Sequence, residues 1–321
     1  MEPRVNIISV NYNSAEDILQ CIFSLRKSTY KSFQLFIVDN QSTDDSIRII
    51  RNEFTNEAIS FSEFTPKEIL KDTQRSTIKN KEVVLIKNDE NKGFAAGNNV
   101  ALQFLLQERK NEFIWLLNPD VELEPDVMAN LVTLYQGRKK LILGNLIHHY
   151  ANREKIMFCG GFQVKKLSHG INNITQKKNI AKIDAISGAS FFTKMDTFRE
   201  LGLLPETYFM YWEETDFCTL AKKHKYQFDV NTKSKIYDKI GTSSNNNFTR
   251  EYLYLLNGLR YYKKYYWHYI PLIVLSTFAK LAKAIVFDSK IKKRAVFFGH
   301  IDFFKLCLGR EIDIKSRIKR Q

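Results

Sequence analysis

The chain has 321 residues, with 49 Lys and Arg against 35 Asp and Glu, which gives a formal net charge of +14. Hydrophobic residues make up 44% of it, with only 13 Gly and 6 Pro, so the composition excludes a disordered chain and a collagen-like or proline-rich one. Residues 1–249 carry a net charge of +3 and residues 250–321 carry +11, so we expect an anionic partner for the C-terminal region.

The first half of the chain alternates predicted strands and helices. An apolar, β-branched run predicts a strand over residues 5–10, and a helix from Ser14 to about Ser28 follows, with Ser14 as N-cap and Asp17 at the capping-box position. The further predictions are strands over residues 33–38, 83–86, 113–117 and 141–143, and helices after residues 42–46 and over residues 98–107 and 125–137. We interpret the polar, weakly periodic residues 53–81 as an insertion or a mobile loop. The alternation predicts an α/β fold with a mainly parallel sheet.

Polar residues follow three of the predicted strands, as Asn11-Tyr12-Asn13, Asp39-Asn40 and Asn118-Pro119-Asp120. One such group would be typical of a turn, because Asn and Asp favour turns. In mainly parallel sheets, however, ligands bind beyond the carboxyl ends of the strands. Three polar groups at such ends therefore predict a shared site at one edge of the sheet.

Six short motifs follow one another within residues 4–265. They are Val10-Asn11-Tyr12-Asn13, Val38-Asp39-Asn40-Gln41-Ser42-Thr43-Asp44, Asn91-Lys92-Gly93-Phe94-Ala95-Ala96-Gly97-Asn98-Asn99, Leu117-Asn118-Pro119-Asp120-Val121, Ser187-Gly188-Ala189 and Phe209-Met210-Tyr211-Trp212-Glu213-Glu214-Thr215-Asp216. In this order they resemble the family 2 glycosyltransferases with the GT-A fold, in particular the bacterial rhamnosyltransferase-like branch. The resemblance implies a Rossmann-like sheet flanked by helices, as in nucleotide-diphospho-sugar transferases, with residues 1–249 as the catalytic domain.

The resemblance also implies a site for a nucleotide-sugar donor, such as a UDP- or dTDP-sugar. The segment Asn11-Tyr12-Asn13 would hold the nucleobase, Asp39 would accept a hydrogen bond from the base or the ribose, and Gly93 would permit a close backbone approach. The turn at Asp39 is also typical of a helix N-cap, and the two roles are compatible. The residues implied for donor binding are Val10, Asn11, Tyr12, Asn13, Asp39, Asn40, Lys92, Gly93, Phe94, Asn98 and Asn118.

A divalent metal ion, Mg²⁺ or Mn²⁺, is expected beside Asp120. Related enzymes have an Asp-x-Asp motif where this chain reads Asn118-Pro119-Asp120, so a single carboxylate remains and the ion would depend heavily on diphosphate oxygens. Asp238 stands where relatives often have a His. It is a second candidate metal ligand, or else a solvated loop acid.

The acidic segment Glu213-Glu214-Thr215-Asp216 is expected to supply the general base. The resemblance implies an inverting single displacement in which one carboxylate takes the proton of the acceptor hydroxyl. We expect Glu214 to be this base, with Glu213 as the alternative and Asp216 as a positioning residue or an acceptor contact. Acidic residues are also favourable in the first turn of a helix, which would explain part of the pattern.

Residues 250–321 are predicted to form helices rich in aromatic and basic residues. Beyond Pro271, Val274, Phe278, Leu281 and Ile285 share one helical face, which is typical of a helix lying in a membrane interface. The longest stretch without Asp, Glu, Lys or Arg in this region has 15 residues, short of the ~20 that span a bilayer. The alternative is a helical cap packed on the catalytic domain, with a solvated basic face.

Together these features predict an enzyme that transfers a hexosyl or deoxyhexosyl group to a glycolipid or a growing surface polysaccharide, such as lipopolysaccharide or capsule. The expected location is cytoplasmic, at the inner face of the cell membrane, and the four widely spaced cysteines are expected to be reduced thiols. The alternatives are a non-catalytic GT-A relative or assembly partner and a basic nucleic-acid-binding protein. For the latter we find no helix-turn-helix, zinc or RNP signature, so no nucleic acid is expected.

Overall fold

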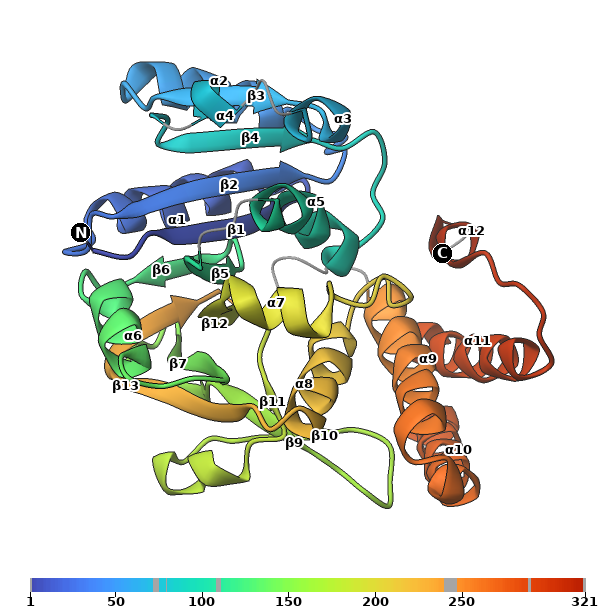
Figure 1. Cartoon of the computed structure of the whole chain (residues 1–321). Helices are drawn as coiled ribbons and strands as arrows, with labels where there is room; N and C mark the ends of the chain where they lie inside the picture. The colour runs from blue at the N-terminus through green and yellow to red at the C-terminus, as the bar shows by residue number, and fades with distance from the viewer. Residues whose placement is uncertain are drawn as a thin grey trace.

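The computed structural model describes residues 2–71, 75–78, 80–107, 111–239, 247–287 and 290–319 (Figure 1). Within these residues the main sheet has ten strands in the order β3-β4-β2-β1-β5-β12-β7-β13-β6, with β8 paired to β7. The strands are β1 Val5–Asn11, β2 Phe33–Asp39, β3 Phe61–Phe64, β4 Val83–Lys87, β5 Phe113–Leu117, β6 Val121–Leu123, β7 Leu141–His149, β8 Ile156–Cys159, β12 Ser190–Lys194 and β13 Gln227–Asp238.

The N-terminal part of the main sheet is parallel. Strands β3, β4, β2, β1 and β5 all run in one direction, whereas β12 is antiparallel to β5 and β7, and β6 is antiparallel to β13. Side chains on both faces of β1, β2, β4 and β5 are mostly buried, which explains why these strands stand out in the sequence as continuous apolar runs. The predicted α/β fold with a mainly parallel sheet is confirmed.

Helices cover both faces of this sheet (Figure 1). On one face α1, α2 and α6 pack through residues such as Ile18, Phe54 and Leu131, and on the other α5, α7 and α8 pack through residues such as Leu102 and Phe217. The bounds are α1 Ala15–Arg26, α2 Ser46–Asn56, α3 Pro66–Ile69, α4 Arg75–Ile78, α5 Phe94–Leu106, α6 Val127–Tyr135, α7 Met195–Leu201 and α8 Glu213–Lys223. A small sheet of β9 Gly161–Val164, β10 Ile171–Asn173 and β11 Ala185–Ile186, with the 3₁₀-helix Lys177–Lys182, lies beside them.

Two segments differ in detail from what the sequence predicts. In residues 53–81, interpreted as an insertion or a mobile loop, α2 continues to Asn56 and β3 pairs in parallel with β4, so part of this segment is an edge strand of the sheet. At α1, Ser14 is the N-cap residue, but its hydroxyl donates to Oδ1 of Asn11 and makes no cap bond. Asp17 does not complete a capping box, because its carboxylate accepts from Nζ of Lys239 at 2.5 Å.

The C-terminal region is helical in its described residues, as predicted. It contains α9 Asn247–Tyr265, a 3₁₀ turn Trp267–Tyr269, α10 Ile270–Phe287, α11 Lys290–Cys307 and α12 Ile314–Lys319. These helices share their own apolar cluster, which includes Leu256, Ile273 and Phe303 and also Trp212 of the preceding segment. In the part of the chain that the structure describes, every helix is too short or too polar to cross a membrane.

Candidate active site

A cleft of about 280 Å³ lies beyond the carboxyl ends of β1, β2 and β5. Residues from all three strand ends meet there, together with the start of α5, the segment before β12 and the start of α8. The lining residues are Val10, Tyr12, Ser14, Asn40, Asn91, Gly93, Phe94, Asn118, Pro119, Asp120, Ser187, Gly188, Ala189, Met210, Tyr211, Glu213 and Glu214. The structure thus brings together the strand ends and most of the motifs that the sequence singled out.

Asp39 and Asn11 are buried beneath the cleft and do not line it. The Asp39 carboxylate accepts hydrogen bonds from Nδ2 of Asn11 at 2.8 Å and from the backbone N–H of Ser42 at 2.9 Å. Asn13 lies on the outer side, where its Oδ1 accepts from the backbone N–H of Thr43. These side chains therefore tie the end of β1 to the turn after β2, while Tyr12 is exposed and available to a ligand.

Gly93 begins α5, with a positive φ of 92° that favours glycine. The close approach predicted there exists, but the neighbour is the backbone of Phe209, whose carbonyl oxygen accepts from the N–H of Phe94 at 2.9 Å. Asn40 holds the same turn, because its Nδ2 donates to the Gly93 carbonyl at 2.9 Å. The ring of Phe94 lies over Gly188.

Two of the residues implied for donor binding point elsewhere. Lys92 is exposed and forms an ion pair with Glu90 at 3.0 Å, and Glu90 also accepts from Lys315 of α12. Asn98 is buried within α5, where its Nδ2 donates to the carbonyl oxygen of Phe94. Neither side chain lines the cleft.

The predicted metal ligands lie at adjacent ends of the paired strands β6 and β13, where Asp120 directly precedes β6. Asp120 follows β5, is 5% exposed and lines the cleft together with Asn118. Asp238 ends β13 and pairs in register with Val121, and the Asp120 carbonyl oxygen accepts from the N–H of Lys239 at 3.2 Å. Asp238 itself is buried and does not line the cleft. Among the described residues no three His, Cys, Asp or Glu side chains gather closely enough to hold a metal ion by themselves.

Glu213 and Glu214 form the first turn of α8 at the wall of the cleft. Oε2 of each is buried, and neither Oε2 has a hydrogen-bond partner among the described residues. Burial raises the pKa of Glu214 to about 7. Burial also raises the pKa of Glu213 well above its usual value, with the charge of Glu214 as the second cause. The helix N-terminus favours a carboxylate by only about 0.3–1 kcal/mol, so desolvation decides the direction.

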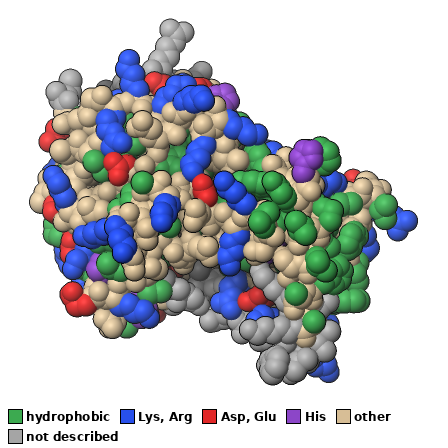
Figure 2. Space-filling model, turned by 90° about the horizontal axis from the view of Figure 1, so that it is seen from below, with side chains coloured by type: hydrophobic (Ala, Val, Ile, Leu, Met, Phe, Trp, Pro, Cys, Tyr) green, Lys and Arg blue, Asp and Glu red, His purple; other side chains and the backbone are tan. Residues whose placement is uncertain are grey.

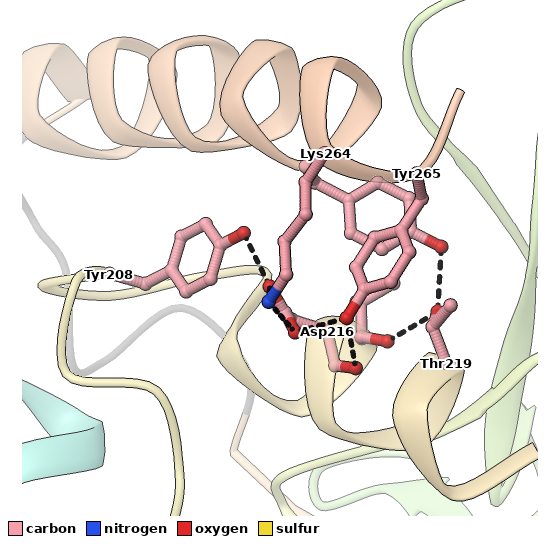
Figure 3. Close-up of polar contacts among 7 residues, drawn as sticks. Tyr208, Asp216, Thr219, Lys264 and Tyr265 are labelled. Atoms are coloured by element: carbon pink, nitrogen blue, oxygen red, sulfur yellow. Dashed lines mark hydrogen bonds and ion pairs between the residues drawn. The ribbon is translucent and has the colours of Figure 1, made fainter. Parts of the chain in front are cut away.

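Asp216 faces the C-terminal helices and not the cleft (Figure 3). Its carboxylate accepts from Nζ of Lys264 at 2.8 and 2.9 Å, from the hydroxyl of Tyr265 at 2.7 Å and from the hydroxyl of Tyr208 at 2.8 Å. Because Asp216 does not line the cleft, its place fits a positioning residue better than an acceptor contact. Sequence reasoning missed the contacts with Lys264 and Tyr265, because these residues lie 48 and 49 residues further along the chain.

Comparison with known proteins agrees with this geometry. The model of glycosyl transferase family 2 matches residues 6–202, more than half of the chain. The chain belongs to this family. A curated relative, the low-salt glycan biosynthesis hexosyltransferase Agl10 of Haloferax volcanii, is 25% identical over 228 residues, which are 68% of this chain and 62% of the relative. The match therefore spans less than two thirds of that relative.

Solved structures show that the fold is GT-A. The mannosyltransferase PcManGT from Pyrobaculum calidifontis, in complex with GDP-Man and Mn²⁺, superposes over 99% of this chain and 84% of its own, with a TM-score of 0.56 and 14% identity. GalNAc-T7 with UDP, GalNAc and Mn²⁺ superposes over 81% of this chain and 48% of its own, with a TM-score of 0.59 and 14% identity.

Proposed function

We propose that this glycosyltransferase moves a hexosyl or deoxyhexosyl group from a nucleotide-diphosphate donor to an acceptor hydroxyl, with inversion at the anomeric carbon. One observation carries the proposal: Asp120 and the pair Glu213-Glu214 line the same cleft as the strand ends. A donor lying across those strand ends would have its diphosphate near Asp120. The acceptor would then approach from the side of Glu214.

Glu214 is the group that takes the acceptor proton. A general base works best when its pKa lies near the operating pH, and the pKa of Glu214 is about 7. Glu213 is the more deeply buried of the two, and burial raises its pKa well above the usual value. The smaller burial of Glu214 favours it over Glu213 as the base. Because Glu214 attacks no carbon in this scheme, the sugar is displaced once and its configuration inverts.

The cleft suits a hard divalent cation such as Mg²⁺ or Mn²⁺. Asp120 offers a carboxylate and Asn118 an amide oxygen, and both are hard oxygen ligands. Since no larger acidic cluster gathers in the described residues, diphosphate oxygens would complete the coordination. When bound, the ion would neutralise charge on the departing nucleoside diphosphate. Asp238, one strand away, stays a candidate ligand. PcManGT and GalNAc-T7 were both solved with Mn²⁺, which supports this assignment.

The acceptor is proposed to be a glycolipid or a growing surface polysaccharide at an anionic membrane, on its cytoplasmic face. Of the thirteen large hydrophobic side chains exposed in the described residues, nine lie in the C-terminal region: Trp267, Tyr269, Leu272, Leu275, Phe278, Ile291, Phe297, Phe304 and Leu308. Figure 2 shows hydrophobic side chains gathered over these helices, with Lys and Arg around them. Apolar side chains bordered by basic ones favour the interface of an anionic bilayer.

The exposed face of α10 differs from the predicted one. Val274 packs against the C-terminal apolar cluster, and the hydroxyl of Ser276 accepts from the N–H of His169 at 3.0 Å. The exposed face instead runs through Leu272, Leu275 and Phe278. Leu281 and Ile285 belong to the residues whose side chains the structure does not describe.

A donor screen tests the proposed reaction. UDP-, dTDP- and GDP-sugars would be offered with and without Mn²⁺, with thermal shift as the binding readout and proton NMR of the glycoside as the readout of configuration. We expect one nucleotide class to stabilise the protein in the presence of Mn²⁺ and the product to have the inverted configuration. A retained configuration would contradict the single displacement. Binding without turnover on lipid-linked acceptors would favour the non-catalytic alternative.

A further inference from the structure

The backbone just before Glu213 adopts an unfavourable conformation. Tyr211 and Trp212 have φ values of 68° and 77°. Two successive residues are therefore in the left-handed region, although neither is glycine. Such a conformation costs about 1–3 kcal/mol per residue and persists only where the surrounding structure holds it. Because Trp212 is the N-cap residue of α8, the conformation of this turn sets how the side chains of Glu213 and Glu214 are oriented at the start of the helix.

Helix α9 makes the contacts that hold this turn. Nδ2 of the fully buried Asn257 donates to the carbonyl oxygen of Met210 at 2.8 Å. The indole N–H of Trp212 donates to the carbonyl oxygen of Tyr254 at 3.0 Å. Gly258 allows the close approach of Trp212 and of His169, since a Cβ there would lie 2.9 Å from Cζ2 of Trp212 and closer still to Nε2 of His169. Tyr254, Asn257 and Gly258, which lie within five residues of α9, therefore all contact this turn or make room for it.

A second clamp lies on the first turn of α8 itself (Figure 3). Lys264 and Tyr265, at the end of α9, bind the carboxylate of Asp216. Asp216 is two residues beyond Glu214, and it is buried with its charge compensated by the Lys264 ammonium. Helix α9 thus contacts the chain both before and after the two glutamates.

We propose that α9 positions the general base, with Asn257 and Lys264 as its positioning residues. The inference rests on the proposed transfer reaction, because it assigns these residues a role toward Glu214. It adds that the C-terminal region is part of the catalytic apparatus as well as a membrane-facing surface. Asn257 holds the left-handed turn, and Lys264 fixes the orientation of the first turn of α8 through Asp216.

Two matched pairs of variants in the full chain test this. Asn257→Leu removes the amide that binds Met210, and its control Tyr252→Phe removes another buried α9 hydrogen bond, to Asp302 of α11. Lys264→Met removes the ammonium on Asp216, and its control Lys263→Met changes the adjacent exposed lysine.

We expect Asn257→Leu and Lys264→Met to lower kcat about tenfold or more with little change in donor KM, because small misplacements of a catalytic group are costly. The controls should keep wild-type kcat.

Amide hydrogen exchange of the peptide 209–217 supplies a readout that does not need turnover. Asn257→Leu and Lys264→Met should speed its exchange, while the exchange of α5 stays as in the wild type. The proposal would be overturned if the test and control variants lost kcat equally, in proportion to their losses of melting temperature. It would also be overturned if the exchange of peptide 209–217 stayed unchanged in Asn257→Leu and Lys264→Met. If the wild type itself transfers no sugar, the proposed function fails, and the exchange data still decide whether α9 holds the turn.

Discussion

The backbone of Gly93 lies directly against the carbonyl oxygen of Phe209, so closely that a Cβ atom at Gly93 would fall far inside van der Waals contact. This packing joins the motif that begins α5 to the segment that leads into Glu213. The start of α5 and the segment before α8, which both line the cleft, are therefore packed directly against each other.

Replacing Gly93 by Ala should disturb both stability and donor binding. Gly93 has φ 92° and ψ −174°, a conformation that is essentially confined to glycine and costs another residue about 1–3 kcal/mol, and the steric overlap adds a further ~1–3 kcal/mol. Gly137→Ala is the matched control, because Gly137 has φ 71° but no atom within 4 Å of the position that an added Cβ would take. Urea unfolding should show a clearly larger loss for Gly93→Ala than for Gly137→Ala. Equal losses would mean that the Phe209 contact is unimportant.

Replacing Glu213 by Gln should stabilise the protein at alkaline pH. The folded-state pKa of Glu213 is raised above its unfolded value, so the folded state binds the extra proton and stability falls as pH rises above the unfolded pKa of about 4.5. A neutral glutamine avoids this loss. The melting temperature of Glu213→Gln should exceed that of the wild type by about 3 °C or more at pH 8, with a smaller difference at pH 5. The same difference at both pH values would contradict the raised pKa.

Replacing Asp120 by Asn should weaken the response to the metal ion. The Mn²⁺ concentration for half-maximal transfer should rise by about tenfold or more, because the cleft-lining carboxylate is lost. Mn²⁺ should also no longer strengthen donor binding in calorimetry. Asp126→Asn, at the exposed N-cap of α6, should behave as the wild type. Unchanged metal dependence in Asp120→Asn would remove Asp120 from the metal site.

The sequence predicted β1, β2, β4, β5, the start of β7 and the meeting of strand ends at the cleft, because the signals for these features are local. Apolar runs ended in polar groups at β1, β2 and β5, and the structure places those ends together. The edge strand β3 was missed because Ser62 and Glu63 interrupt its short apolar pattern. The start of α5 at Phe94 was missed by four residues, because Gly93 makes a poor N-cap signal without a capping side chain.

The roles of single polar residues could not be read in the same way. Lys92 and Asn98 belong to a motif implied for donor binding. The Lys92 ammonium, however, forms an ion pair with Glu90, and the Asn98 amide donates to the carbonyl oxygen of Phe94 in its own helix. The contacts of Asn257 and Lys264 with residues 210 and 216 join positions nearly 50 residues apart, and no periodicity reports such contacts. Side-chain direction and long-range packing, which only coordinates supply, decided these cases.

Charges placed on the exposed face of α10 should weaken membrane binding. The double variant Leu272→Glu/Leu275→Glu should bind vesicles of equal parts phosphatidylglycerol and phosphatidylcholine about tenfold or more weakly in a sedimentation assay, since each leucine loses its apolar burial. Ile49→Glu on α2, an exposed apolar position outside the C-terminal helices, is the control and should bind as the wild type. A wild type that ignores these vesicles would refute the proposed surface.

The most direct measurement is the pH dependence of kcat for the wild type and for Glu214→Gln. The wild-type kcat should rise with pH through about 7, as Glu214 loses its proton and becomes a base. Glu214→Gln should lower kcat by about a hundredfold or more and abolish that rise, while the dissociation constant of the donor stays near the wild-type value. Wild-type kcat in Glu214→Gln, with the pH profile unchanged, would contradict the account of this cleft.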